Sequence, residues 1–198
     1  EWPEKVKLMQ EHWIGKSTGA EITFKTDRSI DLTVFTTRPD TIYGVTFVTM
    51  ALDHPLVDQL VTDKQKDAVE AYRKNFMHMT EHEKTIEDKQ KTGVFTGAYV
   101  VNPMNNKQVP VYIADYVLMG YGTGVVMGVP ASDERDFAFA KKYNLEIIPV
   151  VRPYNNVDEF VAADGTIIKG YEGDGILINS GPLDGLDAKT DGIRDVIM

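Results

Sequence analysis

Short apolar runs typical of β-strands recur along this 198-residue chain, and a few helical patterns interrupt them at irregular intervals. A parallel α/β fold requires strands and helices to alternate regularly, and this chain does not show that alternation. We therefore predict a single α+β domain over residues 1–198, with a mixed, barrel-like β-sheet core and peripheral helices.

The strand patterns are short and are bounded by turn residues. Polar and apolar side chains alternate over residues 21–34 around Asp27 and Arg28, which predicts a β-hairpin. Further strands are predicted over residues 45–50, 109–113, 125–129, 145–151 and 175–178.

Three helices are predicted between these strands. A capping-box pattern precedes helical spacing over residues 63–77. Ser132 is a suitable N-cap for a helix over residues 133–143, with Phe137 on the inner side. A closing helix is predicted over residues 187–198.

The composition excludes several classes of protein. The chain has no cysteine, so disulfides and cysteine-based zinc sites are excluded. Its four histidines are scattered and offer few ligands for a metal cluster. Its net charge of −9 argues against nonspecific nucleic-acid binding, which needs a basic surface. No apolar run approaches the roughly 18 residues that span a bilayer, and residues 1–5 lack a secretory-signal pattern. We expect a cytoplasmic protein without a membrane partner or a metal.

Residues 36–41, with the sequence TTRPDT, place three threonines around an Arg-Pro-Asp turn. Pro39 favours extended geometry at Arg38 and a turn after it, so the threonine side chains should project from the end of a strand. Short hydroxylated side chains commonly satisfy backbone groups at such positions. Taken alone, the pattern favours this structural role.

Four carboxylates, Asp40, Asp133, Glu134 and Asp136, offer the oxygen ligands that Mg²⁺ prefers. Acids in turns and at helix starts more often act as caps and dipole partners, which explains all of them except Asp136. Asp136 should share a helix face with Asp133 near a strand end, where a carboxylate can receive an ammonium group. A magnesium-dependent phosphohydrolase that uses Asp40, Asp133 and Asp136 stays open as a hypothesis.

Nucleotide-binding and covalent-catalysis patterns are poorly matched. The glycine-rich run 120–124 lacks a dinucleotide fingerprint, because Val125 stands where glycine is required and no helix follows. The chain has no cysteine nucleophile and no defensible serine–histidine–acid pattern. An enzyme with this sequence would have to act by positioning its reactants.

Several segments together resemble the editing domain of bacterial-type leucyl-tRNA synthetases, which are class I aminoacyl-tRNA synthetases. The resemblance spans nearly the whole chain and rests on Trp2-Pro3, WIGKS at 13–17, TTRPDT at 36–41, Tyr43-Gly44, His54-Pro55-Leu56, GYGTGVVMGVPA at 120–131 and DERDF at 133–137. The combination resembles the leucyl branch more closely than the isoleucyl and valyl branches. Ser132 departs from the family, which often has histidine there.

The resemblance implies an aminoacyl-tRNA deacylase that edits mischarged tRNA(Leu). It would hydrolyse the ester of isoleucine, norvaline or methionine-like residues and would spare leucyl-tRNA(Leu). No cofactor is implied for editing, and ATP would be used only by the synthetic body of the parent leucine–tRNA ligase. The expected partners are the aminoacylated 3′ end of tRNA(Leu) and the remainder of the synthetase chain, with residues 1–18 and 187–198 near the junctions.

The resemblance also implies a set of catalytic residues. Thr36 and Thr37 would support the ester carbonyl and a water molecule, and Asp136 would pair with the substrate ammonium. Thr41 would supply the bulk that excludes the branched end of leucine.

Four further residues would bind the substrate. Arg38 and Tyr121 would help to place the terminal adenosine, and Met127 and Val129 would line the side-chain pocket. The alternative is a noncatalytic module that orients tRNA or contacts a partner protein.

Overall fold

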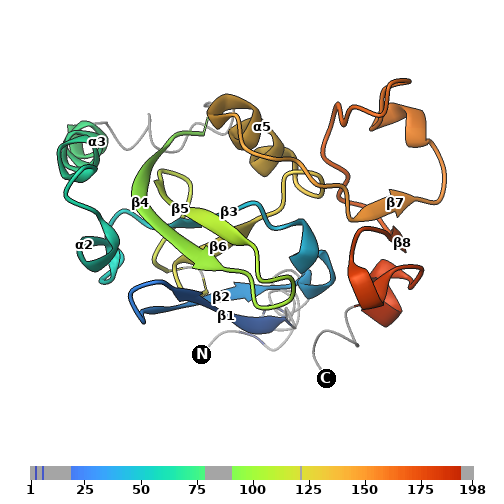
Figure 1. Ribbon diagram of the computed structural model, residues 1–198, viewed down its shortest axis with the longest axis horizontal. Coiled ribbons are helices and arrows are strands. Elements are labelled where there is room, and N and C mark those ends of the chain that lie inside the picture. Colours follow the sequence, from blue (N-terminus) through green and yellow to red (C-terminus); the bar gives the residue numbers. More distant parts are fainter. Residues whose placement is uncertain (1–2, 4–5, 7–18, 79–90, 121, 193–198) are drawn as a thin grey trace.

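Figure 1 shows the computed structural model, which describes residues 3, 6, 19–78, 91–120 and 122–192. Its centre is a six-stranded sheet with the strand order β2-β1-β4-β5-β3-β6. The strands are β1 (Ala20–Thr26), β2 (Asp31–Thr36), β3 (Phe47–Met50), β4 (Gly93–Val101), β5 (Gln108–Ala114) and β6 (Val125–Gly128). The predicted mixed α+β class is confirmed.

The sheet combines both strand directions but does not close. β3 and β5 run parallel, whereas the other neighbouring pairs are antiparallel. The edge strands β2 and β6 lie close together because the sheet curls, yet no ladder joins them in the described residues. The expected barrel is therefore corrected to an open, curled sheet.

Helices and a second, smaller sheet surround this centre (Figure 1). α2 (Val57–Leu60) and α3 (Lys66–His78) pack on β4, and α5 (Glu134–Tyr143) follows β6. β7 (Val151–Pro153) and β8 (Gly175–Leu177) form a separate antiparallel pair. The remaining short elements are η1 (Pro39–Gly44), η2 (Val157–Glu159), η3 (Gly181–Leu183) and η4 (Ala188–Gly192).

Two groups of buried side chains hold the elements together. The larger one joins the sheet to β7, β8 and α2, and includes Phe24, Val48 and Leu177. In the smaller one, Phe139 of α5 stacks on Phe47 with 4.9 Å between ring centroids. Phe139 is thus the residue that anchors α5, whereas the predicted inner residue Phe137 is only partly buried.

The hairpin predicted over residues 21–34 is confirmed, because β1 and β2 pair antiparallel with Phe24 opposite Leu32. The helix predicted over residues 63–77 is confirmed as α3. The strands predicted around β3, β5, β6 and β8 are present within one or two residues of the expected bounds.

Three other local predictions need correction. The N-cap of α5 is Asp133 rather than Ser132, because the Asp133 side chain accepts hydrogen bonds from the backbone N–H groups of residues 135 and 136. The strand predicted over 145–151 contributes only the first residue of β7. Within the predicted closing helix, residues 188–192 form a π-helical turn, and residues 193–198 lie outside the described part.

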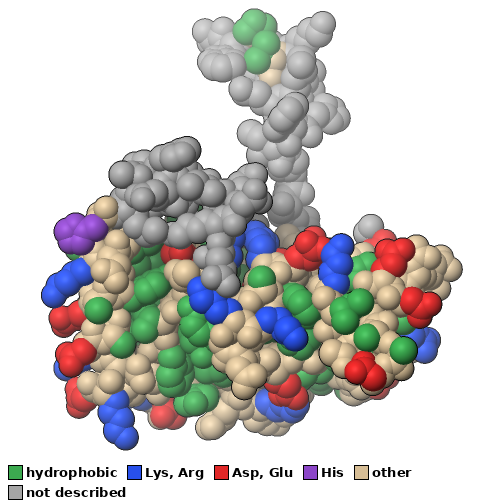
Figure 2. All heavy atoms as spheres, turned by 90° about the horizontal axis from the view of Figure 1, so that it is seen from above, with side chains coloured by type: hydrophobic (Ala, Val, Ile, Leu, Met, Phe, Trp, Pro, Cys, Tyr) green, Lys and Arg blue, Asp and Glu red, His purple; other side chains and the backbone are tan. Residues whose placement is uncertain are grey.

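The surface carries charges of both signs. On the face seen in Figure 2, Lys and Arg side chains lie interspersed with Asp and Glu side chains among hydrophobic ones. Over the described residues, no helix is long and apolar enough to cross a membrane.

Candidate functional site

A cavity of about 390 Å³ opens where the end of β2 and the turn after it face β6 and the start of α5. Seven of the eight predicted site residues line it: Thr36, Thr37, Arg38, Thr41, Met127, Val129 and Asp136. The eighth, Tyr121, lies outside the described residues. Segments about 90 residues apart in the sequence therefore meet at one cavity, and the roles of the residues stay predictions.

The threonine-rich segment forms one side of the cavity as β2 gives way to η1. The hydroxyl oxygen of Thr36 accepts a hydrogen bond from the Arg38 backbone N–H at 3.0 Å. The Thr41 hydroxyl donates to the Arg38 carbonyl oxygen at 2.9 Å, and Thr41 is only 1% exposed. Thr37 is exposed. The structural role of Thr36 and Thr41 at the strand end is therefore real, and it also fixes the direction of both side chains.

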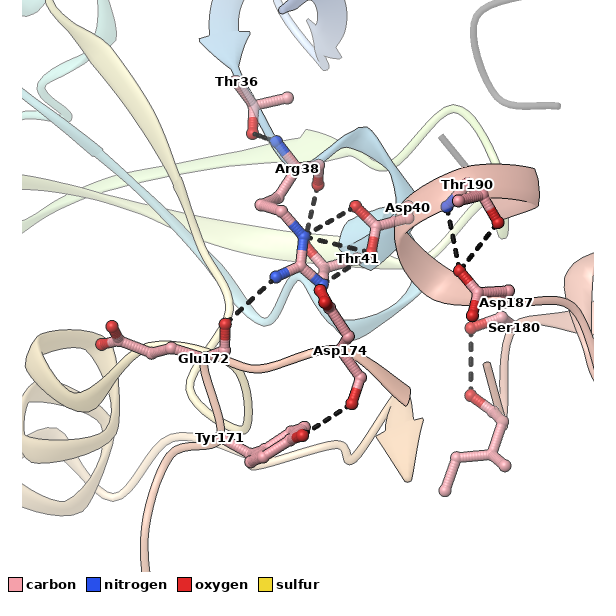
Figure 3. Close-up of polar contacts among 11 residues, drawn as sticks. Thr36, Arg38, Asp40, Thr41, Tyr171, Glu172, Asp174, Ser180, Asp187 and Thr190 are labelled. Atoms are coloured by element: carbon pink, nitrogen blue, oxygen red, sulfur yellow. Dashed lines mark hydrogen bonds and ion pairs between the residues drawn. The ribbon is translucent and has the colours of Figure 1, made fainter. Parts of the chain in front are cut away.

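Arg38 is held by Asp40 (Figure 3). Its Nε lies 3.0 and 3.2 Å from the two carboxylate oxygens of Asp40, and its Nη2 lies 2.8 Å from Oδ2. Asp40 is fully buried, and its hydrogen bonds raise the pKa of Arg38. The outer Nη1 donates to the Glu172 carbonyl oxygen at 3.4 Å, so the guanidinium has a fixed orientation.

Asp136 lies opposite, in the first turn of α5. Its Oδ2 accepts a hydrogen bond from the Val129 backbone N–H at 2.8 Å, and its own N–H donates to the N-cap residue Asp133 at 3.1 Å. It is 6% exposed, and burial together with the negative charge of Asp133 raises its pKa to about 7. The second oxygen, Oδ1, has no donor among the described residues, so this carboxylate can receive a cationic group from the cavity.

The apolar side of the cavity comes from β6 and the residue just after it. Met127 is buried and Val129 partly buried, and the two lie two positions apart on the same face of the chain. Polar groups thus line the cavity on the threonine and Asp136 sides, and aliphatic groups line it between them.

A sequence profile described as "Leucyl-tRNA synthetase, editing domain" matches residues 11–197. The chain belongs to this editing-domain family. It is 51% identical over 190 residues to a leucine–tRNA ligase of Synechococcus sp. (strain JA-2-3B'a(2-13)), covering 93% of this chain and 22% of the relative. A leucine–tRNA ligase of Rubrobacter xylanophilus is 50% identical over 186 residues, with the same coverage.

A solved structure has the same fold. It is described as the crystal structure of the ternary complex of Agrobacterium radiobacter K84 agnB2 LeuRS-tRNA-LeuAMS, and it aligns with a TM-score of 0.64 and 36% identity. The match covers 78% of this chain and 19% of that one. This editing-domain chain spans about a fifth of the length of the relatives that it matches.

Three of the four carboxylates considered as magnesium ligands are paired with basic side chains in this editing domain. Asp40 binds Arg38, Asp133 caps α5 and pairs with Arg135 at 3.0 Å, and Glu134 pairs with Lys169 at 2.9 Å. Across residues 19–78, 91–120 and 122–192, no three His, Asp or Glu side chains gather as a metal site would require. The structure does not bring Asp40, Asp133 and Asp136 together as a metal-binding cluster.

Sequence reasoning missed several residues that line the cavity. Tyr116, Val117 and Leu118 reach it from the loop after β5, and Ser132 reaches it from the turn before α5. Nothing in the local sequence marks the three loop residues, because their position depends on tertiary packing, such as the contact between the Tyr116 ring and Phe139 of α5. Ser132 was considered only as a helix N-cap and as a departure from the family pattern.

One further segment joins the two sides of the site. The Tyr171 backbone N–H donates to the Ala131 carbonyl oxygen at 2.9 Å, and the Glu172 side chain accepts from the Glu134 backbone N–H at 3.2 Å. The Glu172 carbonyl oxygen is also the acceptor of Arg38. Residues 171–172 thus form a strap between the start of α5 and the turn after β2.

Asp40→Ala should destabilise the domain, because it leaves the Arg38 guanidinium without its buried partner. Removing one partner of a buried pair costs about 3 to 5 kcal/mol. Because the Arg38 side chain is 28% exposed and stays partly hydrated, we expect no more than about 3 kcal/mol here. Urea unfolding at pH 7 measures the change. The matched control is Asp58→Ala, which removes an ion pair to Arg73 whose carboxylate is 80% exposed, and this should cost less than about 1 kcal/mol. Equal effects of the two substitutions would contradict a structural role for Asp40.

Proposed function

We propose that this chain is the editing unit of a leucyl-tRNA synthetase and hydrolyses the ester of tRNA(Leu) that carries a noncognate amino acid. The observation that carries the proposal is a cavity with a threonine-lined side, a buried carboxylate and an aliphatic wall around one space. Membership of the editing-domain family supports the same conclusion.

Hydrolysis in this cavity would depend on positioning rather than on a strong base. An aminoacyl ester is already reactive, so a held water molecule that attacks the carbonyl needs support mainly for the developing oxyanion. Thr36 retains a hydroxyl proton to donate, since its oxygen only accepts from Arg38. Thr36 and Thr37 therefore bind the carbonyl and the water, and the neighbouring ribose hydroxyl helps to orient that water. The ester C–O bond then breaks, and the ribose oxygen leaves with a proton.

Asp136 provides the anchor for the amino acid. The α-ammonium group of the substrate pairs with Oδ1, the carboxylate oxygen that has no donor in the described part of the chain. Because Asp136 is buried, this contact lies in a medium of low polarity where a charge pair is strong. The anchor fixes the ester relative to the threonines.

Selectivity comes from a second sieve. A synthetic site rejects an analogue that differs by one methylene by only about 1 to 3 kcal/mol, so errors must be removed afterwards. Met127 and Val129 accept the side chain of the noncognate residue, and Thr41 excludes the branched end of leucine. Thr41 suits this role because it is buried at the cavity and its rotamer is fixed by Arg38.

The partners follow from the same substrate. The terminal adenosine of tRNA(Leu) lies at Arg38 and Tyr121, and the rest of the synthetase chain delivers the acceptor end at a high effective concentration. That delivery removes the need for a basic surface and is consistent with a net charge of −9. Editing needs no ATP, which serves the synthetic reaction of the parent enzyme, and the proposal includes no metal ion or other cofactor.

The test is deacylation of tRNA(Leu) charged with isoleucine, norvaline or leucine, with EDTA present throughout. We expect hydrolysis of the isoleucyl and norvalyl esters above the uncatalysed rate and none of leucyl-tRNA(Leu). Activity that disappears with EDTA would favour the magnesium-dependent alternative. Binding of tRNA without hydrolysis of any ester, even when the remainder of the synthetase is restored, would favour the noncatalytic module.

A further inference from the structure

The strap and the residue before it pack closely on the start of α5. A Cβ atom added to Gly170 would lie 2.8 Å from both the carbonyl carbon and the carbonyl oxygen of Asp133, so only glycine fits there without a shift. The next residue, Tyr171, donates its N–H to the Ala131 carbonyl oxygen at 2.9 Å. The strap therefore lies directly against the N-cap of α5, and its position and that of the helix start depend on each other.

Glu172 pairs with an N–H group at the start of α5 that the N-cap side chain does not take. The Asp133 side chain accepts from the N–H groups of Arg135 and Asp136, and the Glu134 N–H donates to the Glu172 carboxylate at 3.2 Å. The first N–H groups of a helix have no partner within the helix, and its dipole favours a negative charge there. Glu172 therefore acts as a second cap, supplied by a segment 38 residues away.

The same residue also holds the opposite side of the cavity. The carbonyl oxygen of Glu172 accepts a hydrogen bond from Nη1 of Arg38 at 3.4 Å (Figure 3), and Asp40 binds the rest of that guanidinium. Asp136 follows Glu134 by two residues in the first turn of α5. Glu172 is thus bonded both to the helical turn that carries Asp136 and to Arg38, and both of these residues line the cavity.

The charge of Glu172 also acts on Asp136. Burial and the negative charge of Asp133 raise the pKa of Asp136 to about 7, and the negative charge of Glu172 acts in the same direction. The backbone hydrogen bond to the carboxylate and the positive charge of Arg135 act in the opposite direction. The phenol of Tyr116 lies in the field of the same carboxylate. A change of charge at Glu172 should therefore be measurable at Asp136.

We propose that Glu172 is a positioning residue for editing. Its carboxylate fixes the start of α5, and with it Asp136, whereas its carbonyl group holds Arg38, so the two ends of an aminoacyl-adenosine are bound at a set separation. A displacement of about 1 Å can reduce a rate by about 100-fold, so this support matters although Glu172 is exposed and is not part of the cavity lining. The inference rests on the proposed function, because it concerns the placement of two residues that bind the substrate there.

Deacylation of norvalyl-tRNA(Leu) tests the proposal, with kcat/KM measured from pH 6 to pH 8.5 after the uncatalysed rate is subtracted. Glu172→Ala removes the acceptor of the Glu134 N–H, whereas Glu172→Gln keeps an acceptor and removes only the charge. The matched control is Asp164→Ala, which removes an exposed carboxylate that accepts the Thr166 backbone N–H at 2.9 Å, away from the cavity lining. NMR titration of the Asp136 carboxyl group without substrate gives its pKa independently of catalysis, and urea unfolding shows that each variant is folded.

The rate at pH 8.5 reports the position of Asp136, because the carboxylate is charged there in every variant. We expect Glu172→Ala to lose about tenfold in kcat/KM and Glu172→Gln to stay within about twofold of the wild type, with no change in Asp164→Ala. Loss of the Glu172 charge lowers the pKa of Asp136, so Glu172→Gln should be about twofold more active than the wild type at pH 6. The NMR midpoint of Asp136 should move to lower pH in the same variant.

The remaining outcomes separate this inference from the proposed function. If the wild type hydrolyses norvalyl-tRNA(Leu) and Glu172→Ala does so equally well at pH 8.5, the positioning role is wrong and the proposed function stands. Equal losses for Glu172→Ala and Glu172→Gln at that pH also overturn the role, because the charge rather than the held position would then be required. An unchanged Asp136 midpoint in Glu172→Gln overturns it as well. If the wild type hydrolyses no noncognate ester, the proposed function fails, and the positioning role fails with it.

Discussion

Replacing Thr41 by alanine should make the domain hydrolyse leucyl-tRNA(Leu). The substitution removes a buried methyl and hydroxyl from the cavity lining, and the released space accepts the branched end of leucine. A group of this size in a pocket is worth about a 10- to 200-fold difference in rate, so leucyl hydrolysis should rise by that factor. Deacylation of leucyl-tRNA(Leu) and norvalyl-tRNA(Leu) under identical conditions gives the ratio.

Thr41→Val is the matched control, because valine keeps the bulk and loses only the hydroxyl. This variant should continue to spare leucine, although it gives up the hydrogen bond to the Arg38 carbonyl. If valine admits leucine as well as alanine does, the hydroxyl rather than the bulk is the selective feature. If neither variant hydrolyses leucyl-tRNA(Leu), Thr41 is not the gate.

Asp136→Asn should abolish editing and stabilise the fold at the same time. The amide keeps an oxygen for the Val129 N–H but cannot pair with an ammonium group, so norvalyl deacylation should fall by at least about 100-fold. The stability change follows from the raised pKa. The folded state binds the Asp136 proton up to a pH of about 7, whereas the unfolded chain releases it near pH 4.

The sign of the effect fixes its pH dependence. Between about pH 4 and pH 7 the folded state holds more protons than the unfolded state, so Asp136 lowers the stability progressively as the pH rises. The full penalty, about 2 to 4 kcal/mol, is present above pH 7. Urea unfolding should therefore show little difference between wild type and Asp136→Asn at pH 4 and a clear gain for the variant at pH 8. The exposed Asp158→Asn should show no such gain.

The same group controls the pH dependence of editing. Only the charged carboxylate pairs with the substrate ammonium, so kcat/KM for norvalyl-tRNA(Leu) should rise through about pH 7 once the uncatalysed rate is subtracted. A flat profile from pH 6 to pH 8 would contradict the role of Asp136 as the anchor. Residues that serve function often lower the stability of the fold, and the buried carboxylate of Asp136 fits this pattern.

Local patterns predicted the parts of the fold that depend on neighbours in the sequence. The hairpin around residues 27–28 and the helix α3 follow from alternation and helical spacing. β4, the longest strand of the sheet, was not predicted, because its pairing with β5 shifts register between Phe95 and Tyr99. Gly97 has a φ of 85° there and leaves room for Thr62, so the two-residue alternation is interrupted.

The candidate site also has a part that could be predicted from the sequence and a part that could not. The seven residues that line the cavity were predicted from a family resemblance. Residue spacing alone does not predict that Thr41 and Asp136 line the same cavity. Neither the binding of Arg38 by Asp40 nor the approach of Tyr116 was predicted, because the first depends on the η1 turn and the second on packing against Phe139.

The strap at residues 171–172 implies an order of assembly during synthesis. The turn after β2 is synthesised first. The hydrogen bond from Arg38 to the Glu172 carbonyl oxygen can form only after another 134 residues have been added. Closing so long a loop is slow compared with forming the hairpin or α3. A nascent chain therefore acquires most of its sheet before the cavity is complete, and the cavity cannot be closed until residues 171–172 have been synthesised.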